Sequence, residues 1–277
     1  VGLTLDEISI SGIPASIEPA IDYKVAKVAR FPFDKFTSAS KQLSTQMKAT
    51  GEVMSLGQSV EEIMLKAVRG LEIGVDHFEM KKFKDWSKED LLKEIATPTD
   101  ERLFALCEAI RKGATNEEIA DSTKIVIEFV QMLREVVEYE AVLAENVKDV
   151  EVLKKAKDMG FSDSYIARVW GVDERELYDF RKEHGIIPVY KMVDTCAGEY
   201  KSYVPYFYST YENDIHSGDT VEATAPINIS TNTRMNIFLY GIIYFIIRPN
   251  CLISTFFSIS SSLKYVFLDA IITPPHS

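Results

Sequence analysis

The sequence has 277 residues, of which 46% are hydrophobic and 26% charged, a composition typical of a globular protein and not of a collagen, a solenoid or a disordered chain. The 31 Lys and Arg residues are outnumbered by 42 Asp and Glu residues, and the net charge of −11 argues against nucleic acid or an anionic membrane as a partner. Three widely spaced cysteines, Cys107, Cys196 and Cys251, form no disulfide framework, so we expect a reducing, cytoplasmic setting.

Residues 14–74 mix strand and helix patterns. Residues 21–28 alternate apolar and polar side chains, which is the period of a half-buried strand. Ser59 and Glu62 have the spacing of a capping box, followed by a helical apolar pattern. This pattern predicts a helix from Ser59 to about Glu72 that ends at Gly74.

Residues 76–187 are predicted to be almost entirely helical. The candidate helices are 87–96, 99–112, 115–120, 122–145, 149–158, 162–169 and 173–184, with starts at Ser87, Thr99, Asn116, Ser162 and Asp173. The apolar surface of 122–145 is unusually broad, which places this helix at the centre of a bundle. The connections are short, so neighbouring helices should pack antiparallel or crossed.

The helical region contains a weak internal repeat at an offset of 47. Residues 111–120 resemble residues 158–167: a glycine ends one helix, and Thr115 or Ser162 caps a short helix that carries an Ile-Ala pair. The bundle is therefore interpreted as two related helical-hairpin units.

Several functional readings compete with purely structural ones. Residues 160–184 have the outline of a DNA-binding helix-turn-helix, but Asp173, Glu174 and Glu176 would repel phosphates at the start of the recognition helix. Cys196 has no nearby histidine, the four histidines do not cluster, and the sequence holds no Walker-type or Rossmann-type glycine-rich loop. The residues alone give no catalytic, cofactor-binding or metal site. The aromatic stretch 188–212 is interpreted as a strap across another domain, in preference to a base-stacking surface.

Long strings nevertheless carry a family resemblance. TQMKATGEVM at 45–54, KAVRGLE at 66–72, PVYKMVDTCA at 188–197 and YSTYE at 208–212 resemble the large subunit of carbamoyl phosphate synthetase, in the same order and spacing. The resemblance covers residues 1 to about 212. It implies the following domains: 1–75, the C-terminal α+β part of the ATP-grasp domain that makes carboxyphosphate; 76–187, an all-α oligomerisation domain; and 188–212, an extended connector.

The resemblance also implies a function. The family enzyme is an ATP-dependent ligase of arginine and pyrimidine biosynthesis that makes carbamoyl phosphate from bicarbonate, glutamine-derived ammonia and ATP. It uses Mg or Mn, binds a small glutaminase subunit and self-associates. Its ATP contacts and metal ligands match no residue of this sequence, so we expect no cofactor bound by this chain and no catalysis by it alone.

Three positions can be carried over from the family. Ile21, Met47 and Glu52 match residues that line the tunnel through which carbamate travels, where apolar walls exclude water and carboxylates orient it. The structural alternative makes Met47 a core side chain and Glu52 an ion-paired carboxylate.

Residues 213–277 depart from the family and from the composition of the rest of the chain. They carry three basic and four acidic side chains, against 28 and 38 in residues 1–212. Their apolar runs, 235–247 and 251–272, are too short or too interrupted to favour a membrane anchor. We interpret them as an irregular tail, disordered or mis-translated, and the chain, which begins without Met or a signal peptide, as a fragment. The alternative is a stand-alone helical protein-interaction module without catalysis.

Overall fold

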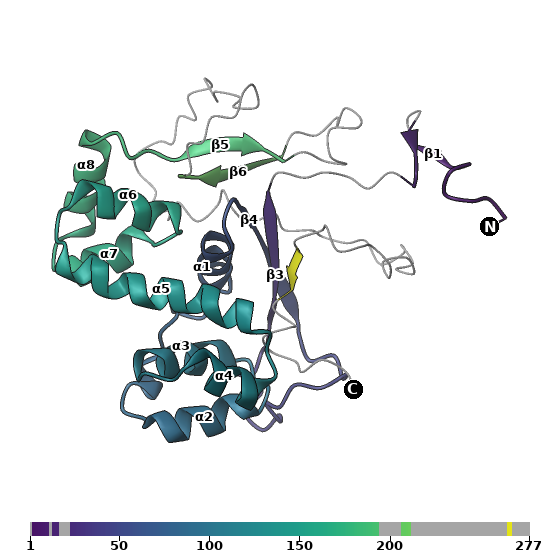
Figure 1. Cartoon of the computed structure of the whole chain (residues 1–277), viewed down its shortest axis with the longest axis horizontal. Helices are drawn as coiled ribbons and strands as arrows, with labels where there is room; N and C mark the ends of the chain where they lie inside the picture. Colours follow the sequence, from purple (N-terminus) through teal and green to yellow (C-terminus); the bar gives the residue numbers. More distant parts are fainter. Residues whose placement is uncertain (1, 11–12, 17–22, 194–205, 212–264, 268–277) are drawn as a thin grey trace.

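The computed structural model describes residues 2–10, 13–16, 23–193, 206–211 and 265–267 (Figure 1). Within these ranges eight α-helices follow a small N-terminal sheet region. The predicted fold class, an α+β segment followed by an all-α bundle, is confirmed. Of the predicted irregular tail, only strand β7 (Tyr265–Phe267) lies within the described residues.

The sheet that supports the bundle is built on strands β3 (Lys24–Arg30) and β4 (Gly51–Gly57). They pair antiparallel, with Lys24 opposite Gly57, and β7 pairs parallel with β3. The predicted strand 21–28 is therefore confirmed from residue 24 onward. One face of these strands is buried beneath helix α1 (Val60–Gly70), which contributes Ile63, Leu65 and other apolar side chains to the core. A separate short hairpin, β1 (Ser9–Ile10) and β2 (Ile13–Pro14), lies nearer the N-terminus.

The cap of α1 is confirmed, with one difference from a full capping box. Ser59 Oγ accepts the backbone N–H of Glu62 at 3.1 Å, while the Glu62 carboxylate accepts from Gln58 N at 2.8 Å and not from the Ser59 backbone. The helix ends at Gly70, two residues before the predicted end.

The remaining helices form the bundle. Their bounds are η1 (Lys81–Phe83), α2 (Lys88–Ala96), α3 (Arg102–Arg111), α4 (Asn116–Thr123), α5 (Ile127–Glu145), α6 (Val150–Asp158), α7 (Asp163–Trp170) and α8 (Glu174–Glu183). Helix α5 runs between the group α2–α4 and the group α6–α8 (Figure 1). Helix α5 contacts α3 and α4 on one side and α6 and α7 on the other. Its central position was predicted from its broad apolar surface.

Two of the predicted helix starts differ from the structure. Thr99 does not cap α3, which begins at Arg102 behind Glu101. Thr99 lies in the turn before the helix, where its carbonyl accepts from Arg102 N at 3.3 Å. The buried guanidinium of Arg102 donates to the carbonyls of Ile95 at 2.6 Å and Thr123 at 2.9 Å. Helix α5 begins at Ile127 and not at 122, because α4 continues to Thr123 and ends at Lys124 in the left-handed conformation.

The internal repeat is a structural repeat. Gly113 and Gly160 both have positive φ, +82° and +89°, and two residues later Thr115 or Ser162 caps the next helix, which begins at Asn116 or Asp163. Eight-residue helices then end at Lys124 and Gly171, both left-handed and 47 positions apart.

A side-chain contact is repeated as well. Arg134 Nε donates to Asn116 Oδ1 at 2.6 Å, and Arg181 Nε donates to Asp163 Oδ2 at 2.8 Å, each partner displaced by 47 residues. The two units, α3–α4–α5 and α6–α7–α8, are thus built on one plan.

The units differ in what covers their glycine turns. A Cβ added at Gly160 would lie 2.7 Å from the Cα of Glu62 on α1, and Arg69 Nη1 donates to the Gly160 carbonyl at 2.8 Å. A Cβ added at Gly113 would meet nothing within 4 Å. Helix α1 therefore rests directly on the backbone of the second unit.

Replacing Gly113 and Gly160 by alanine separates the energetic cost of backbone strain from the cost of a clash with α1. We expect Gly113→Ala to cost about 1–2 kcal/mol, the penalty of a left-handed alanine. Gly160→Ala should cost at least about 3 kcal/mol, because the same strain is joined by a clash with backbone that cannot move aside. Urea unfolding of both variants measures the difference, and equal losses would contradict the close packing of α1.

Candidate functional site: a charge network between the helical units

The three tunnel positions do not come together in the described structure. Ile21 lies outside the described residues. The Met47 side chain is 89% exposed, so the alternative that it belongs to the core is wrong. Glu52 is half-exposed and pairs with Lys27 at 2.7 Å, which confirms the alternative of an ion-paired carboxylate. Lining of a carbamate tunnel remains a prediction for all three.

No catalytic constellation appears among the described residues. In this part of the chain no group of three or more His, Cys, Asp or Glu side chains could hold a metal ion. Cys107 is buried, and burial raises the pKa of its thiol to about 12, which excludes a ready thiolate. Cys196 and Cys251 lie outside the described residues.

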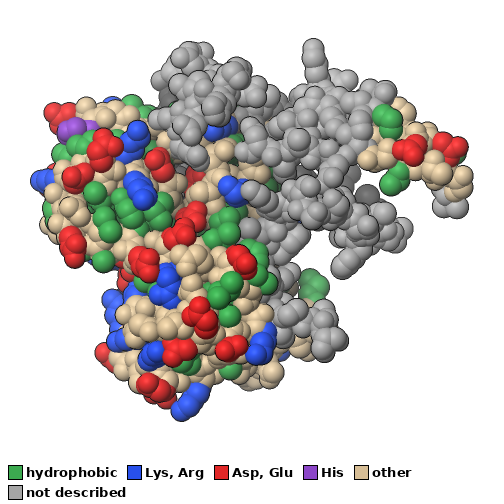
Figure 2. Space-filling model, viewed as in Figure 1, with side chains coloured by type: hydrophobic (Ala, Val, Ile, Leu, Met, Phe, Trp, Pro, Cys, Tyr) green, Lys and Arg blue, Asp and Glu red, His purple; other side chains and the backbone are tan. Residues whose placement is uncertain are grey.

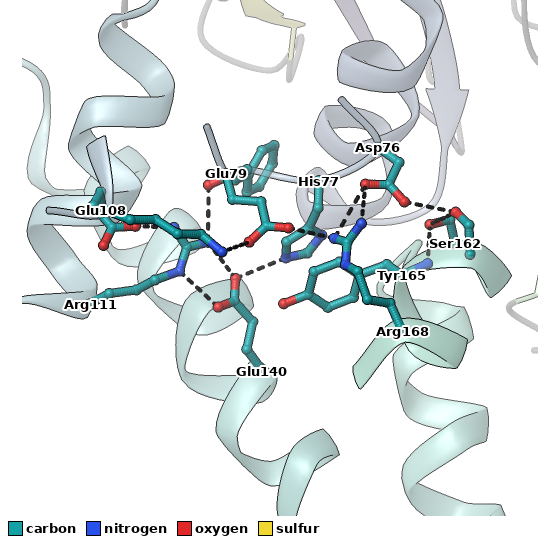
Figure 3. A network of polar contacts seen from close by, with 12 residues as sticks. Asp76, His77, Glu79, Glu108, Arg111, Glu140, Ser162, Tyr165 and Arg168 are labelled. Atoms are coloured by element: carbon teal, nitrogen blue, oxygen red, sulfur yellow. Dashed lines mark hydrogen bonds and ion pairs between the residues drawn. The ribbon is translucent and has the colours of Figure 1, made fainter. Parts of the chain in front are cut away.

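The most elaborate polar cluster lies where the two helical units meet the loop that follows α1 (Figure 3). Its centre is Glu140 on α5. Arg111 on α3 donates to both Glu140 oxygens, from Nε to Oε2 at 2.8 Å and from Nη2 to Oε1 at 2.7 Å, and His77 Nε2 lies 2.8 Å from Oε1. Arg111 and Glu140 come from two helices of the first unit, and His77 comes from the loop.

Arg111 makes two further hydrogen bonds. Nη1 donates to Glu108 Oε2 at 3.0 Å, and Nη2 donates to the Phe78 carbonyl at 3.0 Å. Burial works against the charge of Arg111, but the hydrogen bonds to Glu140 outweigh it and raise the pKa of the guanidinium. Such a largely buried ion pair is stable only while every member keeps its partners.

His77 is fully buried in an aromatic pocket. Its ring stacks on Tyr165 of α7 at 3.7 Å between centroids, with the Phe161 ring at 4.9 Å. Nδ1 has no hydrogen-bond partner in the described part of the chain. Because a carboxylate only accepts hydrogen bonds, we assign the proton to Nε2. Burial lowers the pKa of the imidazole despite the nearby Glu140, so His77 is neutral at neutral pH.

A second arm of the network reaches α7. Arg168 pairs with Glu79 and, at 3.4 Å, with Asp76, and its guanidinium lies over the Tyr165 ring. Asp76 Oδ2 also accepts from Ser164 Oγ at 2.8 Å. The loop 76–79 is thereby held to both units, through Arg111 on one side and Arg168 on the other.

Sequence reasoning missed this network. Positions 77, 111 and 140 are far apart in the chain, and the four histidines were considered only as potential metal ligands. No spacing rule connects these residues. The sole sequence signal is a run of charged and aromatic side chains, Asp76 to Glu79, in the connection that follows α1.

The predicted strap is a β-hairpin, β5 (Val189–Met192) and β6 (Phe207–Thr210). It crosses α1: Gln58 donates to the Tyr208 hydroxyl, and Lys66 Nζ donates to the Ser209 carbonyl. The Tyr211 ring covers Lys157, which pairs with Asp163 at 2.8 Å. Packing against another part of the molecule is confirmed for residues 208–211.

These features define a class of protein. A bundle of two helical units is held to the sheet by α1 and by the hairpin β5–β6, and its described residues bring no catalytic groups together. Residues 52–185 match the sequence model of the carbamoyl-phosphate synthetase large chain, oligomerisation domain. The resemblance to the large chain of carbamoyl-phosphate synthetase is thereby confirmed over these residues, which are similar to its oligomerisation domain. The match includes β4 and α1 together with the bundle.

Among the described residues, no helix has both the length and the apolar character needed to cross a bilayer. Apart from 265–267, the apolar runs 235–247 and 251–272 lie outside the described ranges.

The stability of the chain should fall as the pH drops below about 6.5. The lowered pKa of His77 means that the unfolded chain binds a proton before the folded chain does, so stability is full above pH 6.5 and is lost with a slope of up to about 1.4 kcal/mol per pH unit below it. Urea titrations between pH 7.5 and 5 measure this slope, which His77→Gln should reduce.

His184→Gln, at an exposed histidine, is the matched control and should leave the slope unchanged. The Glu140 carboxyl, whose pKa burial raises but Arg111 and His77 lower on balance, contributes in a separate window below about pH 4.5. An unaltered slope in His77→Gln would contradict the assignment of a neutral, buried imidazole.

Removing Arg111 should be far more costly than removing an exposed cation. Arg111→Met leaves Glu140 and Glu108 buried without their partner, and we expect a loss of about 3–5 kcal/mol. Lys148 pairs with Glu176 at 2.7 Å with both side chains about half exposed, so Lys148→Met should cost less than about 1 kcal/mol. Chemical denaturation compares the two, and similar losses would rule out a structural role for the network.

Proposed function

We propose that this chain acts as part of a carbamoyl phosphate synthetase large subunit and supplies a self-association surface and a section of tunnel wall. The observation that carries the proposal is the match of residues 52–185 to the oligomerisation domain. The bundle α2–α8, with α1 and β4 beside it, occupies these residues. Ile21, Met47 and Glu52 are assigned to the wall of the carbamate tunnel on the resemblance to the family.

The reaction proposed for the whole enzyme is ATP-dependent ligation of bicarbonate and glutamine-derived ammonia to carbamoyl phosphate, with Mg or Mn as cofactor. The small glutaminase subunit is the second proposed partner. This chain alone should not turn over ATP, because the positions that bind nucleotide and metal in the family match none of its residues. The scarce, widely spaced cysteines support a cytoplasmic setting, within arginine or pyrimidine biosynthesis.

A second function is supported by the extent of the core. One continuous cluster of buried side chains runs from Ala26 and Val28 on β3, through α1, to Leu177 in the second unit and Ile186 beyond it. A core of this size supports independent folding. The chain can therefore also be proposed as a stand-alone helical interaction module without catalysis.

Two measurements on the purified chain separate these proposals. Light scattering coupled to size exclusion should give a mass above that of one 31.3 kDa chain, and bicarbonate-dependent ADP release should be absent. Addition of a complete carbamoyl phosphate synthetase should produce mixed oligomers if the chain acts as its oligomerisation domain. Self-association without mixed oligomers would favour the stand-alone module, and ADP release would refute the absence of catalysis.

A further inference from the structure

Two helix starts differ from the others: α3 begins behind Glu101, which makes no side-chain cap, and α5 begins behind an apolar residue. Six of the eight α-helices described begin behind a side chain that accepts a backbone N–H: Ser59, Ser87, Thr115, Asp149, Ser162 and Asp173. Helix α5, the longest of them, begins behind Val126, which cannot do so. The equivalent position in the second unit, 47 residues on, is Asp173, whose Oδ1 accepts Arg175 N at 2.8 Å.

The missing cap coincides with exposed apolar side chains. Val126 is 56% exposed and Ile127 is 39% exposed, and Figure 2 shows hydrophobic side chains at the surface where α5 begins. An aspartate, serine or threonine at the cap would stabilise the helix, and a polar residue at 127 would avoid contact of a large apolar group with water. Both positions are suited to a surface that another molecule covers.

The surroundings extend this surface over α2 and α4. Ser122 Oγ donates to the Leu92 carbonyl at 2.7 Å, and Arg102 links the carbonyls of Ile95 and Thr123. The C-terminal ends of α2 and α4 therefore lie side by side next to the start of α5. Leu92 is partly buried and Ala96 is exposed, so the rim adjoining Val126 contains further apolar area.

The charges at the rim are of both signs. Lys124 and Glu128, two residues before and after Val126, are both exposed. A surface that carries both a cation and an anion beside an apolar centre can pair each charge with its opposite on a second copy across a two-fold axis. Two-fold contacts are the commonest solution for identical chains.

We propose that the start of α5 is the centre of a two-fold contact with a second copy of this chain. Val126 and Ile127 pack against their counterparts, and Lys124 lies opposite the second copy's Glu128. Since a stable dimer buries about 800 Å² per partner, the contact includes the ends of α2 and α4. This inference rests on the proposed self-association and assigns it to one face.

Val126→Asp tests the assignment because its two effects have opposite signs. An aspartate at this position can cap α5, so the melting temperature, measured at concentrations low enough to dissociate the wild type, should rise by about 2–4 °C. The same charge in the centre of an apolar contact should weaken self-association at least about tenfold, measured by sedimentation velocity across a concentration series. Loss of association with a gain in stability cannot be a folding defect.

Val147→Asp is the matched control, since Val147 is 51% exposed in the connection between α5 and α6 and lies outside the proposed contact. It should leave the dissociation constant unchanged. Lys124→Glu and Glu128→Lys should each weaken association, and the double variant should restore it, which also tests the contact if Val126→Asp fails to fold.

The outcomes distinguish this inference from the proposed function. A wild type that remains monomeric at every concentration overturns both. A wild type that associates, while Val126→Asp associates equally well or the charge-reversed double variant fails to recover, overturns the α5 contact and leaves self-association through another face intact.

Discussion

The approach of helix α1 to the turn at Gly160 is the contact on which the arrangement of this protein depends. Here a helix lies against bare backbone, because the glycine has no Cβ and adopts a φ that other residues rarely take. The contact places Arg69 on the Gly160 carbonyl. It also sends the chain after α1 between the two helical units, where Asp76, His77 and Glu79 find their partners.

The two helical units show how one plan serves two environments. Gly113, Asn116 and Arg134 recur as Gly160, Asp163 and Arg181, with the same turn and the same side-chain contact. In the second unit the amide of Asn116 is replaced by a carboxylate, which also pairs with the buried Lys157. A neutral group is sufficient at the open turn, whereas a buried cation requires an anion.

Local signals in the sequence predicted the helices more reliably than their junctions. Ser87, Ser162 and Asp173 were identified because a cap depends on residues within one turn. The start of α3 and the break between α4 and α5 were missed, because Thr99 offers a cap that α3 does not use and Lys124 adopts a left-handed conformation that no local rule required. The contacts of His77, Arg111 and Glu140 depend on tertiary structure, so sequence alone could not reveal them.

The returning hairpin has a consequence for how this bundle can be connected to other domains. The chain leaves the sheet through α1, passes through both helical units and returns to α1, where Lys66 and Gln58 hold β6. The points of entry and exit are thus neighbours, the geometry of a domain inserted into a host. Helices could be added to or removed from such an insertion while the flanking sheet keeps its path, so the assembly properties of the bundle can diverge separately from the part to which it is attached.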